Sequence, residues 1–285
     1  MDPPKVETGF VGFFDILGYK SFLEAGITEV TLKVIEILRS LPDKVNEAVK
    51  KSHLGLENGL LEKAREHDVS APFEQMLREL SRIVPLVVSD SILLRCSYDE
   101  NHGTEKAAQA STFVVYANIL QRLMFEEGLP LRGAIAFGDF VFADHVFAGK
   151  PIIDAHTLGQ SLDLAACAIH KTAEEEFKAL IAVAPQWNGS LNDGLELVRY
   201  QTPMKNVKRP EVKAKEELFL LNLAWPTLKG YTALKDRKDA RSYVEEQFSA
   251  HNKQLGPEVA SKVENTEKFL RDLFERFPEL FIRDP

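Results

Sequence analysis

The first continuous apolar run of the chain covers residues 9–17 and contains one acidic residue, Asp15. Continuous apolar character over this length is typical of a strand buried on both faces. From residue 19 to about residue 51 the apolar positions recur at helical spacing. Pro42, in the stretch 41–43, predicts a break in that helix. The polar, glycine-containing residues 52–69 then predict a variable insertion.

The next segment combines a helical pattern with a hairpin pattern. Residues 70–83 carry an apolar stripe at helical spacing and begin with a serine, a residue that favours helix starts. The stretch "VPLVVSDSILLRC" follows, with two β-branched or leucine-rich arms at 84–88 and 92–96. Arms of this composition around a short polar tip predict a β-hairpin, here with Asp90 at its tip.

The second half of the chain predicts two further helical regions and several strands. Residues 104–127 show the clearest helical pattern, and Gly128 is placed to end it. Residues 129–142 have glycines between apolar arms and predict a second strand pair, and residues 150–177 predict a helix that Gly159 weakens. The remaining expected elements are strands at 180–184, 195–201 and 217–224 and a helical tail at about 238–281.

The order of these elements predicts the fold class. Over residues 9–142 it reads β-α-β-β-α-β, which is the ferredoxin-like arrangement of an antiparallel sheet backed by helices. We therefore expect an α+β fold of this type, with later strands extending the sheet. A main domain is expected over residues 1–230. A C-terminal helical extension over residues 231–285 is expected to pack on that domain or on a second subunit.

Composition restricts the classes of partner. The 285 residues include 35 basic and 43 acidic side chains, for a net charge of −8. Nucleic acids and anionic membranes bind mainly to clustered Lys and Arg, so neither is expected as a partner. The two cysteines, Cys96 and Cys167, show no metal-binding spacing and are expected to be buried thiols. With no signal peptide and no apolar run near about 18 residues, the sequence predicts a cytoplasmic protein.

Asp15 and Asp90 are the candidate chemical residues. In β-α-β-β-α-β connectivity the first strand and the hairpin can lie side by side, so the two aspartates can meet. Two adjacent carboxylates repel each other unless a cation lies between them, and oxygen ligands favour Mg²⁺ or Mn²⁺. The alternative is that Asp15 caps the following helix and Asp90 is only a turn residue. Spacing alone leaves both interpretations open.

The residues that follow Asp15 suggest a phosphate site. A strand that turns through Gly18 into a helix exposes backbone N–H groups and the positive end of the helix dipole. We therefore expect the backbone of residues 16–19 to hold phosphate groups. Together, a metal pair and a phosphate cradle describe a site for a nucleoside triphosphate.

Four motifs in order over residues 10–158 carry a resemblance to a known family. "FFDILGY" resembles the first metal-binding motif of class III nucleotide cyclases, and "VVSDSILL" resembles their second. "LRGAIAFGDF" resembles their Arg-x-Gly strand, and "GKPIIDAHTL" is similar to the start of a helix that follows it. The chain is thus similar to this family over about half its length.

Departures from the family pattern bear on the substrate. Ile153 and Thr157 stand where those cyclases keep a ribose-orienting Asn and a transition-state Arg. The polar pair that selects a purine would fall near Leu86 and Val146, which are apolar. The pattern resembles instead the pyrimidine cyclases of the bacterial Pycsar anti-phage system, through "GKPIIDAHTLGQSLD" and the later "YQTPMK" and "LFLLNLAW".

The resemblance implies a specific reaction and specific binding partners. It implies conversion of UTP to 3′,5′-cyclic UMP and pyrophosphate, with CTP and cyclic CMP as the alternative. It also implies a homodimer with active sites at the subunit interface, and a separate effector protein reached only through the cyclic nucleotide. A second hypothesis is a non-catalytic nucleotide-binding or scaffold module on the same fold. A palm-type dinucleotide cyclase is disfavoured because the hairpin tip is Ser-Asp-Ser.

The resemblance also implies site roles. Asp15 and Asp90, with the backbone carbonyl of Ile16, would hold two divalent ions, Mn²⁺ or Mg²⁺. Arg132 would contact the phosphates as a bidentate donor. The other expected substrate-binding residues are Phe13 on the face of Asp15, Leu17, Gly18 and Tyr19 in the phosphate cradle, and Lys205 with Lys208 in a basic loop. Phe13 is equally consistent with a plain core aromatic, and the lysines with a solvated loop.

Overall fold

The computed structural model describes residues 5–20, 26–53, 78–98, 103–143, 146–205, 214–225, 240–253 and 256–280. The predicted insertion, most of the helix expected at 70–83, and Lys208 lie outside these residues. The elements are β1 (Val6–Ile16), α2 (Glu29–His53), β2 (Ile83–Val88), β3 (Ser91–Ser97), α5 (Gly103–Glu126), β4 (Leu131–Ala143), β5 (Val146–Gly149), α6 (Lys150–Ser161), β6 (Cys167–Ile169), α7 (Lys171–Val183), α8 (Asn188–Leu191), β7 (Leu197–Met204), β8 (Ala214–Leu221), α10 (Ala240–Ser249) and α11 (Pro257–Arg276).

The strands form one mixed sheet in the order β2-β3-β1-β4-β6-β8-β7, and β5 pairs with β4. β1 lies between β3 and β4 and is antiparallel to both. This is the arrangement expected of β-α-β-β-α-β connectivity, so the predicted α+β, ferredoxin-like fold is confirmed. The predicted hairpin is confirmed as β2 and β3, and the clearest predicted helix is confirmed as α5.

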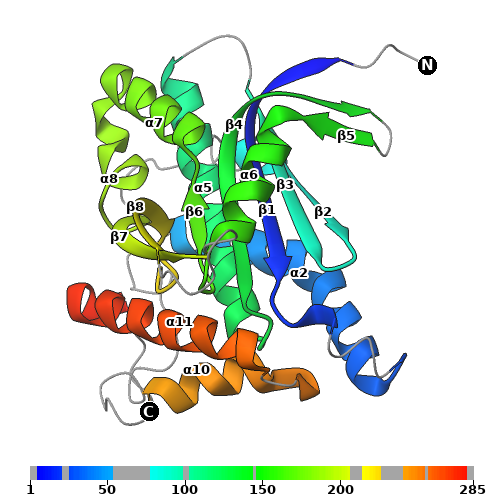
Figure 1. The fold of residues 1–285 in the computed structure, drawn as a ribbon. Coiled ribbons are helices and arrows are strands. Elements are labelled where there is room, and N and C mark those ends of the chain that lie inside the picture. Colours follow the sequence, from blue (N-terminus) through cyan, green and yellow to red (C-terminus); the bar gives the residue numbers. More distant parts are fainter. Residues whose placement is uncertain are drawn as a thin grey trace.

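Helices cover the two faces of the sheet (Figure 1). On one face, Phe10 and Phe14 of β1 belong to an apolar cluster with α2, α5 and α7. On the other, α6, α10 and α11 share a second apolar cluster with Ala134 of β4 and Leu17. α10 and α11 cross below the lower ends of the central strands (Figure 1). The C-terminal helices therefore pack on the same chain, beside the end of β1 that carries Asp15.

The predicted strand pair over residues 129–142 is wrong, because β4 runs unbroken through both glycines and its partner β5 begins only at Val146. These glycines allow close packing instead of a turn. A Cβ on Gly133 would lie 2.3 Å from the carbonyl oxygen of Phe13 on the neighbouring strand. Gly138 has a φ of +150°, a conformation that glycine adopts most easily.

The single helix predicted over residues 150–177 is also wrong. α6 ends at Ser161, the short strand β6 follows, and residues 180–183, predicted as strand, belong to α7. β6 has only three residues, too few to show a period, and it pairs with β4 in parallel. Gly159 stays inside α6 because its missing Cβ lets the helix approach the backbone of Gly133, 3.0 Å from the ideal Cβ position.

The break predicted near Pro42 does not occur. α2 continues from Glu29 to His53 with Pro42 inside it. Val45 and Val49 on its buried face are fully buried in the cluster with α5, and this packing holds the helix together across the missing N–H. Within the described residues, no helix has the length and apolar character needed to cross a membrane.

Candidate active site

The strand end and the hairpin tip meet at the backbone. Asp15 is the last residue but one of β1 and pairs with Ser91 in β3. The next residue, Ile16, donates its N–H to the carbonyl oxygen of Asp90 at 2.8 Å. The side chains of Asp15 and Asp90 both line one cavity of about 500 Å³. The structure thus brings together two residues that are 75 positions apart in the sequence.

Asp15 forms a partly buried ion pair. Its Oδ2 accepts a hydrogen bond from Nη2 of Arg132 at 2.8 Å and one from Nε2 of Gln160 at 3.1 Å. The same Nη2 donates to Oε1 of Gln160 at 2.6 Å, which closes a ring of three side chains. Arg132 is 5% exposed and stands opposite Asp15 in the β1–β4 ladder. A carboxylate that is largely removed from water is stabilised by such a counter-charge, and β4 supplies it for Asp15, whose side chain is 18% exposed.

Gln160 is a site residue that sequence reasoning missed. It belongs to α6, one residue after the glycine that lets this helix approach β4. It lies within the quoted stretch "GKPIIDAHTLGQSLD", but that resemblance gives it no role, so only the close packing of α6 on β4 identifies it. Arg132 also has a buried Nε without a hydrogen-bond partner among the described residues.

The rest of the charged lining is basic. Besides the two aspartates, the charged residues lining the described part of the cavity are Lys20, Arg132, Lys205, Lys253 and Lys262. Burial, and then the positive charges of Arg132 and Lys262, lower the pKa of Lys205 to about 8. Burial alone lowers the pKa of Lys253 to about 7. Cations held in such proximity favour an anionic ligand.

The loop after β1 departs from the predicted phosphate cradle. The N–H of Ile16 is bonded to Asp90, and the N–H of Leu17 donates to the carbonyl oxygen of Pro130 at 2.9 Å. Both N–H groups are hydrogen-bonded within the fold and do not point to a phosphate in this structure, while phosphate binding by the loop as a whole stays a prediction. Gly18 and Tyr19 also line the cavity, and Gly18 has a φ of +77°. Burial, and then the negative charge of Asp90, raise the pKa of Tyr19.

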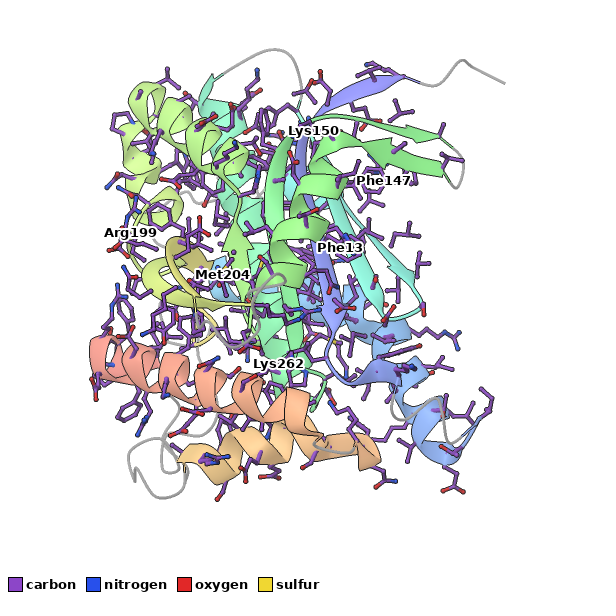
Figure 2. All side chains as sticks on the ribbon, in the orientation of Figure 1. Phe13, Phe147, Lys150, Arg199, Met204 and Lys262 are labelled. Carbon is purple, nitrogen blue, oxygen red and sulfur yellow. The ribbon has the colours of Figure 1, made fainter. Side chains whose placement is uncertain are left out.

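Phe13 lies elsewhere. Its ring packs edge-on against His156 of α6, with 4.9 Å between ring centroids, and it is not among the residues that line the cavity. Figure 2 shows Phe13 on β1 beside α6. The structure therefore supports the core-aromatic alternative for this residue. Ile153 and Thr157 are exposed on α6, and Lys150 at the start of α6 pairs with Asp154 at 2.5 Å.

The donor set suits a hard divalent cation. Both hydrogen bonds to Asp15 end on Oδ2, which leaves Oδ1 for another ligand. Asp90 adds a second carboxylate, and the described residues contain no cluster of three or more His, Cys, Asp or Glu that would favour a closed metal site. Mg²⁺ is commonly held by one or two carboxylates with substrate phosphates completing its ligands, and the cavity offers this combination.

Comparisons with known proteins returned distant structural similarities. The catalytic core of a rhodopsin-guanylyl cyclase with converted specificity, solved in complex with ATPalphaS, is 12% identical with a TM-score of 0.40. The alignment covers 77% of this chain and 98% of that one. The guanylyl cyclase Cya2 is 10% identical with a TM-score of 0.34, over 77% of this chain and 93% of that one. No family model matches the sequence, and no curated protein does.

Proposed function

We propose that this chain is a metal-dependent nucleotide cyclase whose active site is the cavity of Asp15 and Asp90. The observation that carries the proposal is the make-up of the charged lining of that cavity. One carboxylate comes from the end of β1 and the other from the tip of the β2–β3 hairpin, and every other charged side chain in the described lining is Lys or Arg. In a protein with a net charge of −8, such a local excess of cations suits a small polyanion.

The charged residues of the site form two groups with different proposed roles. Asp15 and Asp90, with the Ile16 carbonyl, would hold the divalent ions, Mn²⁺ or Mg²⁺. When bound, these ions lower the pKa of the attacking ribose hydroxyl and neutralise phosphate charge. Arg132 and Lys205 form the second group and bind phosphate oxygens. Arg132 has five N–H donors, so it can bond Asp15 and a phosphate together.

The proposed reaction forms one bond and breaks one. The ribose 3′-oxygen bonds to the α-phosphorus, the bond from that phosphorus to the β-bridging oxygen breaks, and pyrophosphate leaves with the bonding electron pair. The hydroxyl proton passes to solvent. The chain's contribution is to align the two oxygens about the phosphorus and to place cations where charge accumulates on the leaving group.

The proposed substrate is UTP, with CTP as the alternative. Support comes from the resemblance to Pycsar pyrimidine cyclases and from the apolar side chains at Leu86 and Val146. Leu86 is half-buried on β2, and Val146 is 63% exposed on β5. We extend the proposal to the role implied by the resemblance, in which the cyclic nucleotide signals phage infection to a separate effector protein.

A homodimer is part of the proposal. Val88, which precedes the hairpin tip, is 52% exposed, and Ile153 on α6 is 65% exposed. The homodimer rests on the resemblance, and Val88 and Ile153 are the exposed apolar side chains that we propose the partner covers. The position of Thr157 lacks the cation that the family places there, so a partner's lysine would complete the site.

The test is a product assay with each of ATP, GTP, CTP and UTP in the presence of Mn²⁺. Cyclic UMP from UTP, with little product from the purines, is the expected result. Asp90→Ala should abolish the product. Asp139→Ala is the matched control, because Asp139 is an aspartate of β4 that bonds Thr8 and does not line the cavity. A folded dimer with no product from any nucleotide would instead favour the non-catalytic binding module.

A further inference from the structure

The C-terminal helices supply one wall of the proposed site. Five of the residues that line the cavity come from the end of α10 to the first turns of α11, namely Phe248, Lys253, Gly256, Val259 and Lys262. The sheet supplies Asp15 and Arg132 on the opposite side. The segment after residue 240 is therefore part of the cavity and not only a support for the fold.

α11 is fixed to the connection between α6 and β6 by hydrogen bonds on both sides of Lys262. Ser261 donates to Asp163 at 3.1 Å, and Asn265 donates to the carbonyl oxygen of the same residue at 2.9 Å. Thr266 accepts the buried backbone N–H of Ala165 at 2.8 Å. Because these bonds surround Lys262 within about one and a half helical turns, its position on the sheet side of α11 is set by the fold (Figure 2).

Lys262 adds to a group of like charges. Its ammonium is close enough to Lys205 to help lower the pKa of that residue, and Arg132 acts on Lys205 in the same direction. Lys262 of α11, Lys205 directly after β7 and Arg132 of β4 all line the same cavity. Like charges repel, and an anion between them converts this repulsion into attraction.

Lys253 joins the wall to the loop after β1. Its Nζ donates to the carbonyl oxygen of Gly128 at 2.7 Å, and the residue is 5% exposed. Its alkyl chain lies under Gly18, where an added Cβ would be 3.0 Å from Cδ. The amine of Lys253 lies beneath the loop that faces Asp90, and because its pKa is lowered to about 7 it adds positive charge there mainly below pH 7.

We propose that α10 and α11 form a polyphosphate-binding wall, in which Lys262 with Lys205 binds the terminal phosphates of a nucleoside triphosphate from within the same chain. The identity of the ligand as a nucleotide rests on the proposed function. The binding of a linear polyphosphate rests on the cavity alone. The wall thus provides cations to the leaving pyrophosphate without a contribution from a second subunit.

The test is calorimetric titration of the full chain with inorganic triphosphate, without metal, for wild type and Lys262→Gln. Loss of a charge-assisted hydrogen bond predicts affinity lower by about 10-fold or more. Lys268→Gln is the matched control on the same helix, because Lys268 pairs with Glu264 at the surface and does not line the cavity. The control should bind like wild type. Equal affinity of Lys262→Gln and wild type would overturn the proposal.

UTP turnover by the same proteins separates this inference from the proposed function. If wild type makes no cyclic nucleotide but Lys262→Gln still weakens triphosphate binding, the cyclase proposal fails and the wall stands. If wild type makes cyclic UMP and Lys262→Gln changes neither KM nor triphosphate affinity, the wall fails and the cyclase stands. Thermal melting of both variants verifies that each is folded.

Discussion

Arg132 and Asp15 face each other across the β1–β4 ladder, and Nη2 of Arg132 lies 2.8 Å from Oδ2 of Asp15. The residue expected to bind phosphate is thus the counter-ion of the residue expected to bind metal. Because both side chains line the same cavity, a change at one end of the proposed site is transmitted directly to the other.

Replacing Arg132 with Met should remove both stability and activity. The change leaves a partly buried carboxylate whose remaining side-chain partner among the described residues is Gln160, and we expect a loss of about 2 kcal/mol in unfolding free energy. Cyclase activity should fall by at least about 100-fold, because a placed cation at the phosphates is lost. Chemical denaturation and product formation measure the two effects.

Arg95→Met provides the control for that loss. Arg95 pairs with Glu7 at 3.0 Å in the same sheet, with both side chains partly buried, and it does not line the cavity. We expect a smaller loss of stability, about 1 kcal/mol, and activity close to wild type. Equal activity of the Arg132 and Arg95 variants would contradict the role given to Arg132.

Gln160→Leu should weaken metal dependence more than it weakens the fold. Gln160 bonds both Asp15 and Arg132, so it positions the carboxylate without touching substrate. Loss of such outer partners typically raises the half-saturating metal concentration by about 10-fold or more. A Mn²⁺ titration of activity measures this. Gln201→Leu on the exposed face of β7 serves as the control, and an unshifted titration in Gln160→Leu would refute the positioning role.

Gly18→Ala should destabilise the loop after β1. At a φ of +77° an added Cβ is strained, and it would meet the alkyl chain of Lys253 at 3.0 Å. A loss of about 1–2 kcal/mol in unfolding free energy is expected. Gly189→Ala in α8 meets nothing within 4 Å and should be neutral or slightly stabilising, since alanine favours helix. Equal denaturation midpoints for the two variants would refute the strain argument.

The buried Lys253 makes stability depend on pH. Its pKa is lowered from 10.5 to about 7, so above pH 7 the folded chain releases a proton that the unfolded chain keeps. Unfolding free energy should therefore rise with pH from about 7 to 10.5, by at most about 1.4 kcal/mol per pH unit. Denaturation of wild type and Lys253→Met at pH 7, 8 and 9 isolates this slope. Parallel curves would show that Lys253 remains charged throughout.

Local pattern in the sequence was sufficient for the core of the fold. The apolar run of β1, the β-branched or leucine-rich arms on either side of Asp90, and the long helix ended by Gly128 are each set by their own residues. Their order then fixes which strands are neighbours. The meeting of the Asp15 strand end with the Asp90 hairpin tip could be expected for this reason, because topology places them side by side.

What sequence could not show depends on tertiary packing. Gly133 and Gly159 look like turn and helix-weakening signals, yet they allow β1, β4 and α6 to approach closely. That approach is what brings Gln160 to Asp15. Lys253 and Lys262 are more than 230 residues from Asp15 and belong to no motif, so only the docking of α11 reveals them. The hydrogen bond that occupies the N–H of Leu17 likewise depends on the carbonyl oxygen of Pro130, a residue remote in the sequence.

Whether the cavity of Asp15 and Asp90 is a cyclase active site is tested most directly with wild type, Asp15→Asn and Asp90→Asn. The formation of cyclic UMP and of pyrophosphate from UTP and Mn²⁺ is measured for each. Asparagine keeps the shape of each side chain and removes its charge, so loss of folding is avoided as far as possible. If the cavity is the active site, wild type forms equal amounts of cyclic UMP and pyrophosphate, and neither variant forms any. Undiminished product from both variants, or pyrophosphate without a cyclic nucleotide from wild type, would contradict it.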